Sequence, residues 1–119
     1  MYNIVRIGDK NVPMMSKASV DHYYKVIFNE DPIKLQTSDP DVGAMFVFMQ
    51  KMGFVMAKFA EVKESKEMHK LNEDSFYEWL DGFERTDITN ALEDIQATYE
   101  GQSITHSTAK KNKEEQTEE

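Results

Sequence analysis

The segment from Asp41 to Lys63, DVGAMFVFMQKMGFVMAKFAEVK, constrains the fold more than any other part of the chain. Drawn as a helix, it is apolar on nearly every side, which is typical of a helix that the rest of a domain covers. Ser38 or Asp39 followed by Pro40 is a typical helix start, because the N–H that proline lacks would have no partner in the first turn. We therefore expect a long central helix around which the other elements pack.

This helix has one narrow polar sector when successive residues are placed about 100° apart. The sector contains Gln50, Lys51, Lys58 and Glu61. Two large apolar residues, Val47 and Phe54, fall inside it, where a monomer would expose them to water. One interpretation is that the helix is covered on every side and its polar side chains extend along it to reach solvent. The other is that Val47 and Phe54 belong to a protein interface.

Four methionines recur every three or four residues and form a stripe along the same helix. They are Met45, Met49, Met52 and Met56. Methionine fills ordinary cores, but its flexible thioether also suits surfaces that bind varied apolar segments. Both interpretations stay open, and we take Val47, Phe54 and the methionine stripe as the candidate protein-binding residues.

The N-terminal segment predicts a short β-hairpin. Side chains alternate in character over Tyr2–Ile7, turn-forming residues occupy Gly8–Asn11, and the apolar pattern resumes at Val12–Met15. Pro13 cannot donate a ladder hydrogen bond, so the second arm is expected to be an edge strand or to end early. A hairpin of this size must pack on helices to be stable.

Two shorter elements are expected between the hairpin and the central helix. Ser16 or Ser19 can cap a helix that runs to about Phe28, and residues Asn29 to Pro32 would end it. A short turn is expected over residues 33–36.

A pair of amphipathic helices follows the central one. The first has caps around Asn72 and an apolar stripe of Phe76, Trp79, Leu80 and Phe83. The second is capped by Thr86 or Asp87, ends at Gly101, and has a stripe of Ile88, Ala91, Leu92, Ile95 and Tyr99. The sequence thus predicts a mainly α, single domain of four to five helices with an N-terminal hairpin.

Acidic charge is concentrated in this helical pair. Residues 72–100 contain nine Asp/Glu and one Arg, a net charge of −8, which equals the net charge of the whole chain. Acidic residues in first turns stabilise helices, which explains part of this charge. The chain gathers no Lys/Arg cluster of the kind that binds phosphates, so we expect no nucleic-acid partner.

The remaining features limit the function further. From Gln102 onward the chain is almost entirely polar, so we expect a domain over residues 1–101 and a disordered, charged tail over 102–119. No cysteine is present, and the three histidines lack metal-ligand spacing. There is no nucleophile elbow and no phosphate-binding glycine loop. We expect a cytoplasmic protein that is not an enzyme, with no cofactor, no small-molecule substrate and no membrane span.

Three segments together resemble a known family. They are the opening MYNIVRIGDKNVPMM, the segment KLNEDSFYEWLDGFERTDITNALEDI and the polar Lys/Glu tail. In this combination the chain resembles the tail assembly chaperones of phages and prophages of Gram-positive bacteria. The resemblance covers most of the chain and rests on a pattern of helices and tail, with no catalytic signature.

The resemblance implies a non-enzymatic helper in the cytoplasm of the infected or lysogenic host. Such a protein binds and solubilises the long tape measure protein until tail tube protein polymerises around it, and it is not expected in the mature virion. A longer, frameshifted form that recruits tail tube protein is also implied, and an A-rich codon run for Lys110–Lys113 is one place for the frameshift. An ordinary solubilising tail is the alternative.

Other functions stay open at this point. A viral connector or oligomeric scaffold would have a similar composition, and self-association is compatible with each of these roles. An acidic DNA-mimic inhibitor is less well supported, because a mimic of duplex DNA needs acidity over a long surface and here it covers two short helices. A DNA mimic would bind a basic protein in a salt-sensitive way, whereas apolar contacts survive moderate salt.

Overall fold

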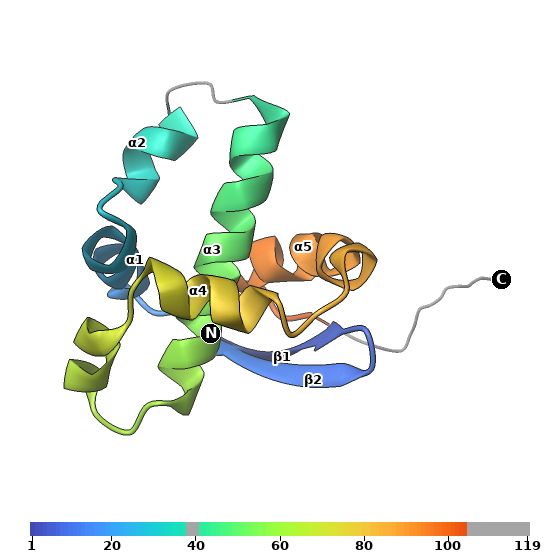
Figure 1. The fold of residues 1–119 in the computed structure, drawn as a ribbon, viewed down its shortest axis with the longest axis horizontal. Coiled ribbons are helices and arrows are strands. Elements are labelled where there is room, and N and C mark those ends of the chain that lie inside the picture. The colour runs from blue at the N-terminus through green and yellow to red at the C-terminus, as the bar shows by residue number, and fades with distance from the viewer. Residues whose placement is uncertain (38–40, 105–119) are drawn as a thin grey trace, which may run out of the picture.

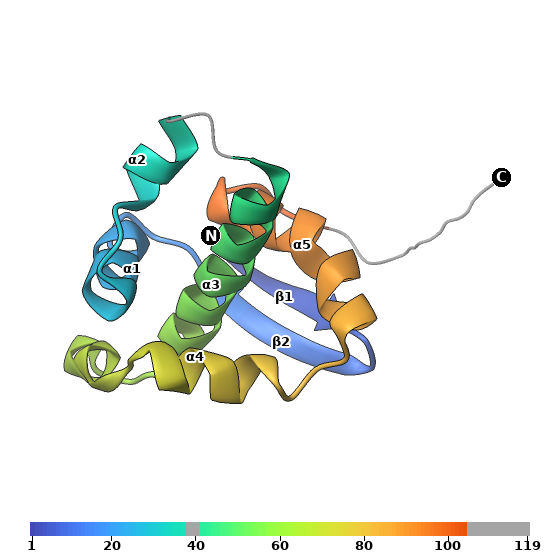
Figure 2. The same ribbon diagram turned by 45° about the horizontal axis from the view of Figure 1, so that its top comes forward.

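The central helix of the computed structural model is α3, Val42–Glu61, and the other elements are arranged around it (Figure 1). The structure describes residues 1–37 and 41–104. The other elements, in chain order, are β1 Tyr2–Ile7, β2 Lys10–Met15, α1 Val20–Phe28, α2 Pro32–Thr37, the 3-10 helix η1 Ser65–Lys70, α4 Glu73–Leu80 and α5 Arg85–Tyr99. The hairpin and α5 lie on one side of α3, and α1 and α2 lie on the other (Figure 2). The prediction of a mainly helical domain with an N-terminal hairpin is confirmed.

The hairpin forms a two-stranded antiparallel sheet in which Val5 pairs with Val12. Its inner face buries Val5, Ile7 and Met14 against the helices, while Tyr2 on the outer face is exposed. The alternation in the sequence therefore reports the two faces of the sheet. Pro13 lies within the second strand, which has only one partner strand and leaves the proline at a sheet edge, as predicted.

Helix boundaries follow local capping chemistry. Asp41 caps α3, since its Oδ1 accepts a hydrogen bond of 2.7 Å from the N–H of Ala44. Asn72 and Ser75 form a capping box at the start of α4. Gly101 ends α5 with a φ of +82°, a conformation that glycine adopts without strain.

Several details of the predicted helices are wrong. The N-cap of α3 is Asp41 rather than Ser38 or Asp39, and Phe83 lies beyond the end of α4. The fifth helix begins at Arg85, so its N-cap is Glu84 rather than Thr86 or Asp87, and Glu84 makes no side-chain capping bond. Residues 65–70 form a 3-10 helix that the sequence did not predict, because Met68 is its one large apolar side chain and no periodic pattern arises from one residue. Met68 is fully buried and anchors this turn.

The core contains a cluster of aromatic rings from three different helices. Phe54 of α3 lies 5.7 Å from Phe76 and 5.8 Å from Trp79, both on α4, and 6.2 Å from Phe28 of α1, as measured between ring centroids. These edge-on arrangements are the favoured geometry for aromatic pairs. The cluster fixes α1 and α4 against the middle of α3.

The C-terminal end of the described chain still contacts the domain. The Asn3 side chain donates to the carbonyl of Gln102 at 2.8 Å, and Ile104 packs partly buried against the core. The rest of the expected tail, residues 105–119, lies outside the described residues.

Candidate protein-binding surface

The two ends of α3 have different surroundings. From Phe48 to Ala57 every residue except the half-buried Gln50 is buried, whereas from Val42 to Val47 none is. Val42 is 83% exposed and Val47 is 45% exposed. A helix of 20 residues is about 30 Å long, and the residues of α3 that the fold buries all lie between Phe48 and Ala57. The N-terminal part of α3 projects from one end of the molecule together with α2 (Figure 1). We call residues 42–47 the uncovered turn of α3.

A cleft of about 200 Å³ lies between α2 and the N-terminal half of α3. Apolar side chains line most of it, with Tyr24, Glu30 and Lys51 as the polar members. The full lining is Tyr24, Glu30, Leu35, Ala44, Val47, Phe48 and Lys51. We call it the α2–α3 cleft. Val47 belongs both to the cleft and to the uncovered turn, so the two features form one continuous surface.

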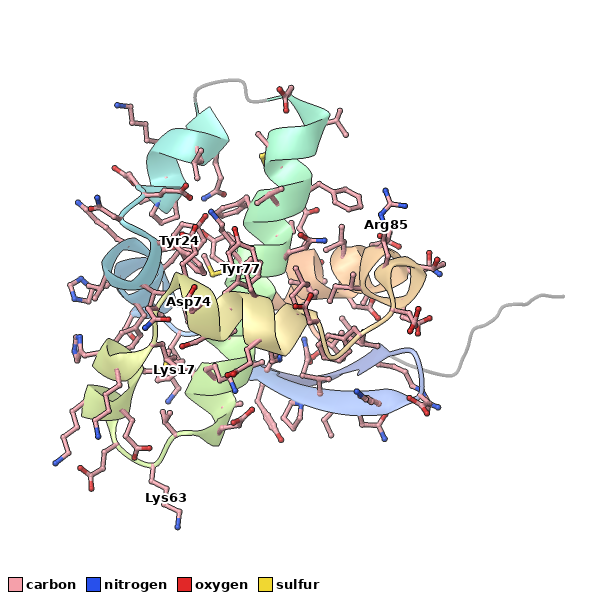
Figure 3. All side chains as sticks on the ribbon, viewed as in Figure 1. Lys17, Tyr24, Lys63, Asp74, Tyr77 and Arg85 are labelled. Carbon is pink, nitrogen blue, oxygen red and sulfur yellow. The ribbon has the colours of Figure 1, made fainter. Side chains whose placement is uncertain are left out.

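The polar members of the lining form a small network. The hydroxyl of Tyr24 donates to Glu30 Oε1 at 2.9 Å, and Lys51 Nζ lies 3.3 Å from Glu30 Oε2. Lys51 Nζ also lies 5.0 Å from the centre of the Phe28 ring, which is a favourable cation–π distance. Burial raises the pKa of Tyr24 far above its ordinary value, and the hydrogen bond to Glu30 raises it further. Figure 3 shows Tyr24 between α1 and α3.

This network explains the low exposure of Lys51. The residue is only 8% exposed although it is charged, because Glu30 neutralises it and its aliphatic stem packs along the helix. Lys51 was expected to face solvent in the polar sector of the helix. From Lys51 to Ala57, the interpretation of a helix covered on every side is the correct one.

Helix α2 is held by a second polar chain. The side-chain amide of Gln36 donates to the Tyr99 hydroxyl at 3.0 Å, and that hydroxyl donates to Asp21 Oδ1 at 2.6 Å. Burial and the bond to Asp21 raise the pKa of Tyr99 to about 12. Residues from α1, α2 and α5 thus meet at one hydroxyl, which fixes the position of the outer wall of the cleft.

The structure separates the sequence-predicted binding residues. Phe54 is fully buried in the aromatic cluster. Of the two interpretations, the helix covered on every side therefore holds at Phe54, and the surface interpretation is wrong there. Met49, Met52 and Met56 are also buried and belong to the core, and Met45 is half-buried. Only Val47 lies at the surface as predicted. A helical wheel gives only the angle of each residue about the helix axis. The burial of α3 by the other elements changes along the axis, so the wheel could not predict which of these residues are exposed.

Three residues of the surface were missed at the sequence level: Val42, Ala44 and Leu35. The signal was present in the run VGAMFV, whose six residues are all apolar or glycine and leave no polar face for solvent. A buried helix and an uncovered one give the same pattern, so composition alone does not separate them.

The rest of the described chain holds no candidate metal site. Among residues 1–37 and 41–104, no group of three or more His, Asp or Glu side chains is placed to hold a metal ion. The acidic residues of α4 and α5 include Glu73 and Asp74 in the first turn of α4, where they complement the helix dipole. Asp74 and the exposed Tyr77 of α4, and Arg85 at the start of α5, are labelled in Figure 3.

Helix α3 is also long and apolar enough to cross a membrane, as judged by length and composition alone. Half of the apolar window is buried inside the fold, and the core helix of a folded domain meets the same criteria. The contacts of Phe54 and its neighbours account for the apolar character of the buried half.

Comparisons with protein-family models, with curated proteins and with solved structures found no significant match.

Proposed function

We propose that this protein is a tail assembly chaperone that binds and solubilises a tape measure protein during phage tail assembly. The observation that carries the proposal is the uncovered turn of α3, where apolar side chains project from an acidic domain beside an apolar cleft. Exposed apolar patches of this kind are typical of binding sites, and a net charge of −8 helps to keep a complex with an apolar client in solution. The resemblance of the N-terminal and acidic segments to this family supplies the identity of the client.

Co-expression tests the proposal directly. The proposal implies a neighbouring gene for a very long helical protein. The chain would be produced together with that protein, and the soluble fraction of the long protein would be measured with and without the chain. We expect the client to be soluble only in the presence of the chain. If the long protein stays insoluble and is not retained by the tagged chain, the proposed function is wrong.

A matched pair of variants ties the activity to the surface. Val47→Asp places a charge in the uncovered turn, whereas Val26→Asp places one at the 47% exposed Val26 of α1, away from the cleft lining. Phe54→Asp is unsuitable, because a charge at this buried position would unfold the domain. We expect Val47→Asp to reduce solubilisation and Val26→Asp to retain it.

The protein content of purified phage particles distinguishes a chaperone from a viral connector or scaffold. A chaperone leaves before the particle matures, so the protein should be missing from purified particles. Its presence there in fixed stoichiometry would favour the structural role. The frameshifted longer product, with a tail tube protein as its partner, is tested on the coding DNA: a tail region without a slippery heptamer would remove that part of the proposal.

A further inference from the structure

We propose that the α2–α3 cleft takes one bulky apolar side chain from a partner helix, and that this helix carries Lys or Arg residues next to the anchoring side chain. The inference rests on the proposed function and deepens it. It names the site on this chain that binds the client, and it names the residue types that the client's binding segment carries. It follows from the size of the cleft, the exposed apolar surface that continues from it, and the charge around it.

The size of the cleft indicates the kind of ligand. Its volume of about 200 Å³ is below the range of about 300–1,000 Å³ that is usual for small-molecule sites. It is suited to a single large aliphatic or aromatic side chain. Anchors of this kind, seated in a pocket and surrounded by weaker contacts, supply most of the affinity in many protein interfaces.

The surface next to the cleft indicates a helix as the partner. Val42 and Val47 are exposed on α3, and Met45 and Phe46 are half-buried between them in sequence. This apolar surface extends from the cleft along the helix axis. An amphipathic helix presents apolar residues three and four positions apart, so it can place one side chain in the cleft and the next ones on the uncovered turn.

The charge around the cleft indicates basic flanks. Asp31 directly precedes α2, and Asp41 directly precedes α3. Asp31 and Asp41 each accept backbone N–H bonds from the helix that follows, so their charges are fixed in place. Within the lining, Lys51 and Glu30 neutralise one another, so the acidic charge that a partner meets beside the cleft is that of Asp31 and Asp41. A partner with Lys or Arg beside its anchor therefore meets complementary charge.

The net charge of the whole chain disfavours a second copy as the occupant. Each copy carries a net charge of −8, and two such molecules repel one another at low ionic strength. Exposed charge pairs add about 0–1 kcal/mol each, so the apolar anchor supplies the affinity and the basic flanks supply the selection.

An NMR titration of the full chain tests the inference with synthetic peptides in place of the unidentified client. The probe is an amphipathic leucine–lysine helix, and the controls are the same peptide with alanine at its leucine positions and the same peptide with glutamate at its lysine positions. We expect the leucine–lysine peptide to shift the amide resonances of Leu35, Ala44 and Val47 and to remain bound at moderate salt. We expect both controls to bind at least about tenfold more weakly, which corresponds to about 1.4 kcal/mol.

Two variants with different physical effects keep the test independent of folding. Ala44→Trp fills the cleft from an exposed position, and Val47→Asp adds a charge at its edge. Both should weaken the leucine–lysine peptide about tenfold or more, whereas Val26→Asp should leave its affinity unchanged. The inference is overturned if the peptide shifts only residues of α4 and α5, if the glutamate peptide binds equally well, or if both cleft variants bind like the unmodified chain. Concentration-dependent shifts at the cleft without peptide would assign it to a second copy and also overturn the inference.

The outcomes separate this inference from the proposed function. A client that is solubilised normally by Ala44→Trp and Val47→Asp would place the binding site elsewhere and leave the chaperone role intact. Peptide binding at the cleft without solubilisation of the tape measure protein would support the cleft and reject the chaperone role.

Discussion

Asn3 and Thr98, 95 residues apart in the chain, are joined by a buried hydrogen bond of 2.9 Å from the Asn3 side-chain amide to the Thr98 hydroxyl. The same amide also donates to the carbonyl of Gln102. One side chain of the first strand therefore holds the C-terminal end of α5 and the residues that follow it. This contact closes the domain by joining its two ends.

Asn3→Ala should lower the free energy of unfolding by about 1–3 kcal/mol, because it leaves the Gln102 carbonyl without this donor and removes a bond from the buried Thr98 hydroxyl. Urea denaturation followed by circular dichroism measures the change. Asn11→Ala, on the exposed outer face of the same hairpin, is the matched control and should stay within about 0.5 kcal/mol of the unmodified protein. Equal effects of the two substitutions would contradict the structural role of Asn3.

Phe54→Ala should cost about 3–5 kcal/mol, since it removes the ring at the centre of the aromatic cluster and leaves a cavity. Chemical denaturation measures this cost, and Val26→Ala is an exposed apolar control for which we expect little change. A near-neutral Phe54→Ala would restore the sequence-based expectation that Phe54 faces solvent.

The Lys51–Glu30 pair should respond asymmetrically to substitution. Lys51→Met keeps the packing and removes the buried charge, so its stability should lie within about 1 kcal/mol of the unmodified protein. Glu30→Gln keeps an acceptor for Tyr24 but leaves the Lys51 charge without its partner, and should cost about 1–3 kcal/mol. Thermal or urea unfolding of both variants, with the double variant Lys51→Met/Glu30→Gln completing the cycle, checks this order. A larger cost for Lys51→Met than for Glu30→Gln would contradict it.

Stability should fall as the pH rises above about 10. The folded protein raises the pKa of Tyr99 from 10.0 to about 12 and also raises that of Tyr24, so the unfolded chain loses these protons first. The contribution is complete below pH 10 and is lost as the pH rises through the folded-state pKa. Near-ultraviolet absorbance should show that Tyr24 and Tyr99 ionise at higher pH in the folded protein than in the unfolded chain. In Tyr99→Phe, the fall in unfolding free energy between pH 10 and 12 should be shallower, and an unchanged slope would argue against this origin.

The sequence by itself determined the position and type of most elements. Alternation over Tyr2–Ile7 gave the first strand, the capping residue Asn72 gave the start of α4, and Gly101 gave the end of α5. These signals are local, because strand alternation, capping bonds and a left-handed glycine each involve residues that are close in the chain. They carry no information about which part of a helix lies beside which distant segment.

The tertiary structure alone decided which part of α3 is covered. Val47 and Phe54 are seven residues apart and share one side of the helix, yet Val47 is exposed and Phe54 is fully buried. The physical reason is the position of each residue along the helix axis. Aromatic rings of α1 and α4 pack against Phe54, and α3 extends beyond that cluster toward Val42. Periodicity fixed the face on which each residue lies, and long-range packing fixed how far along the helix that face is buried.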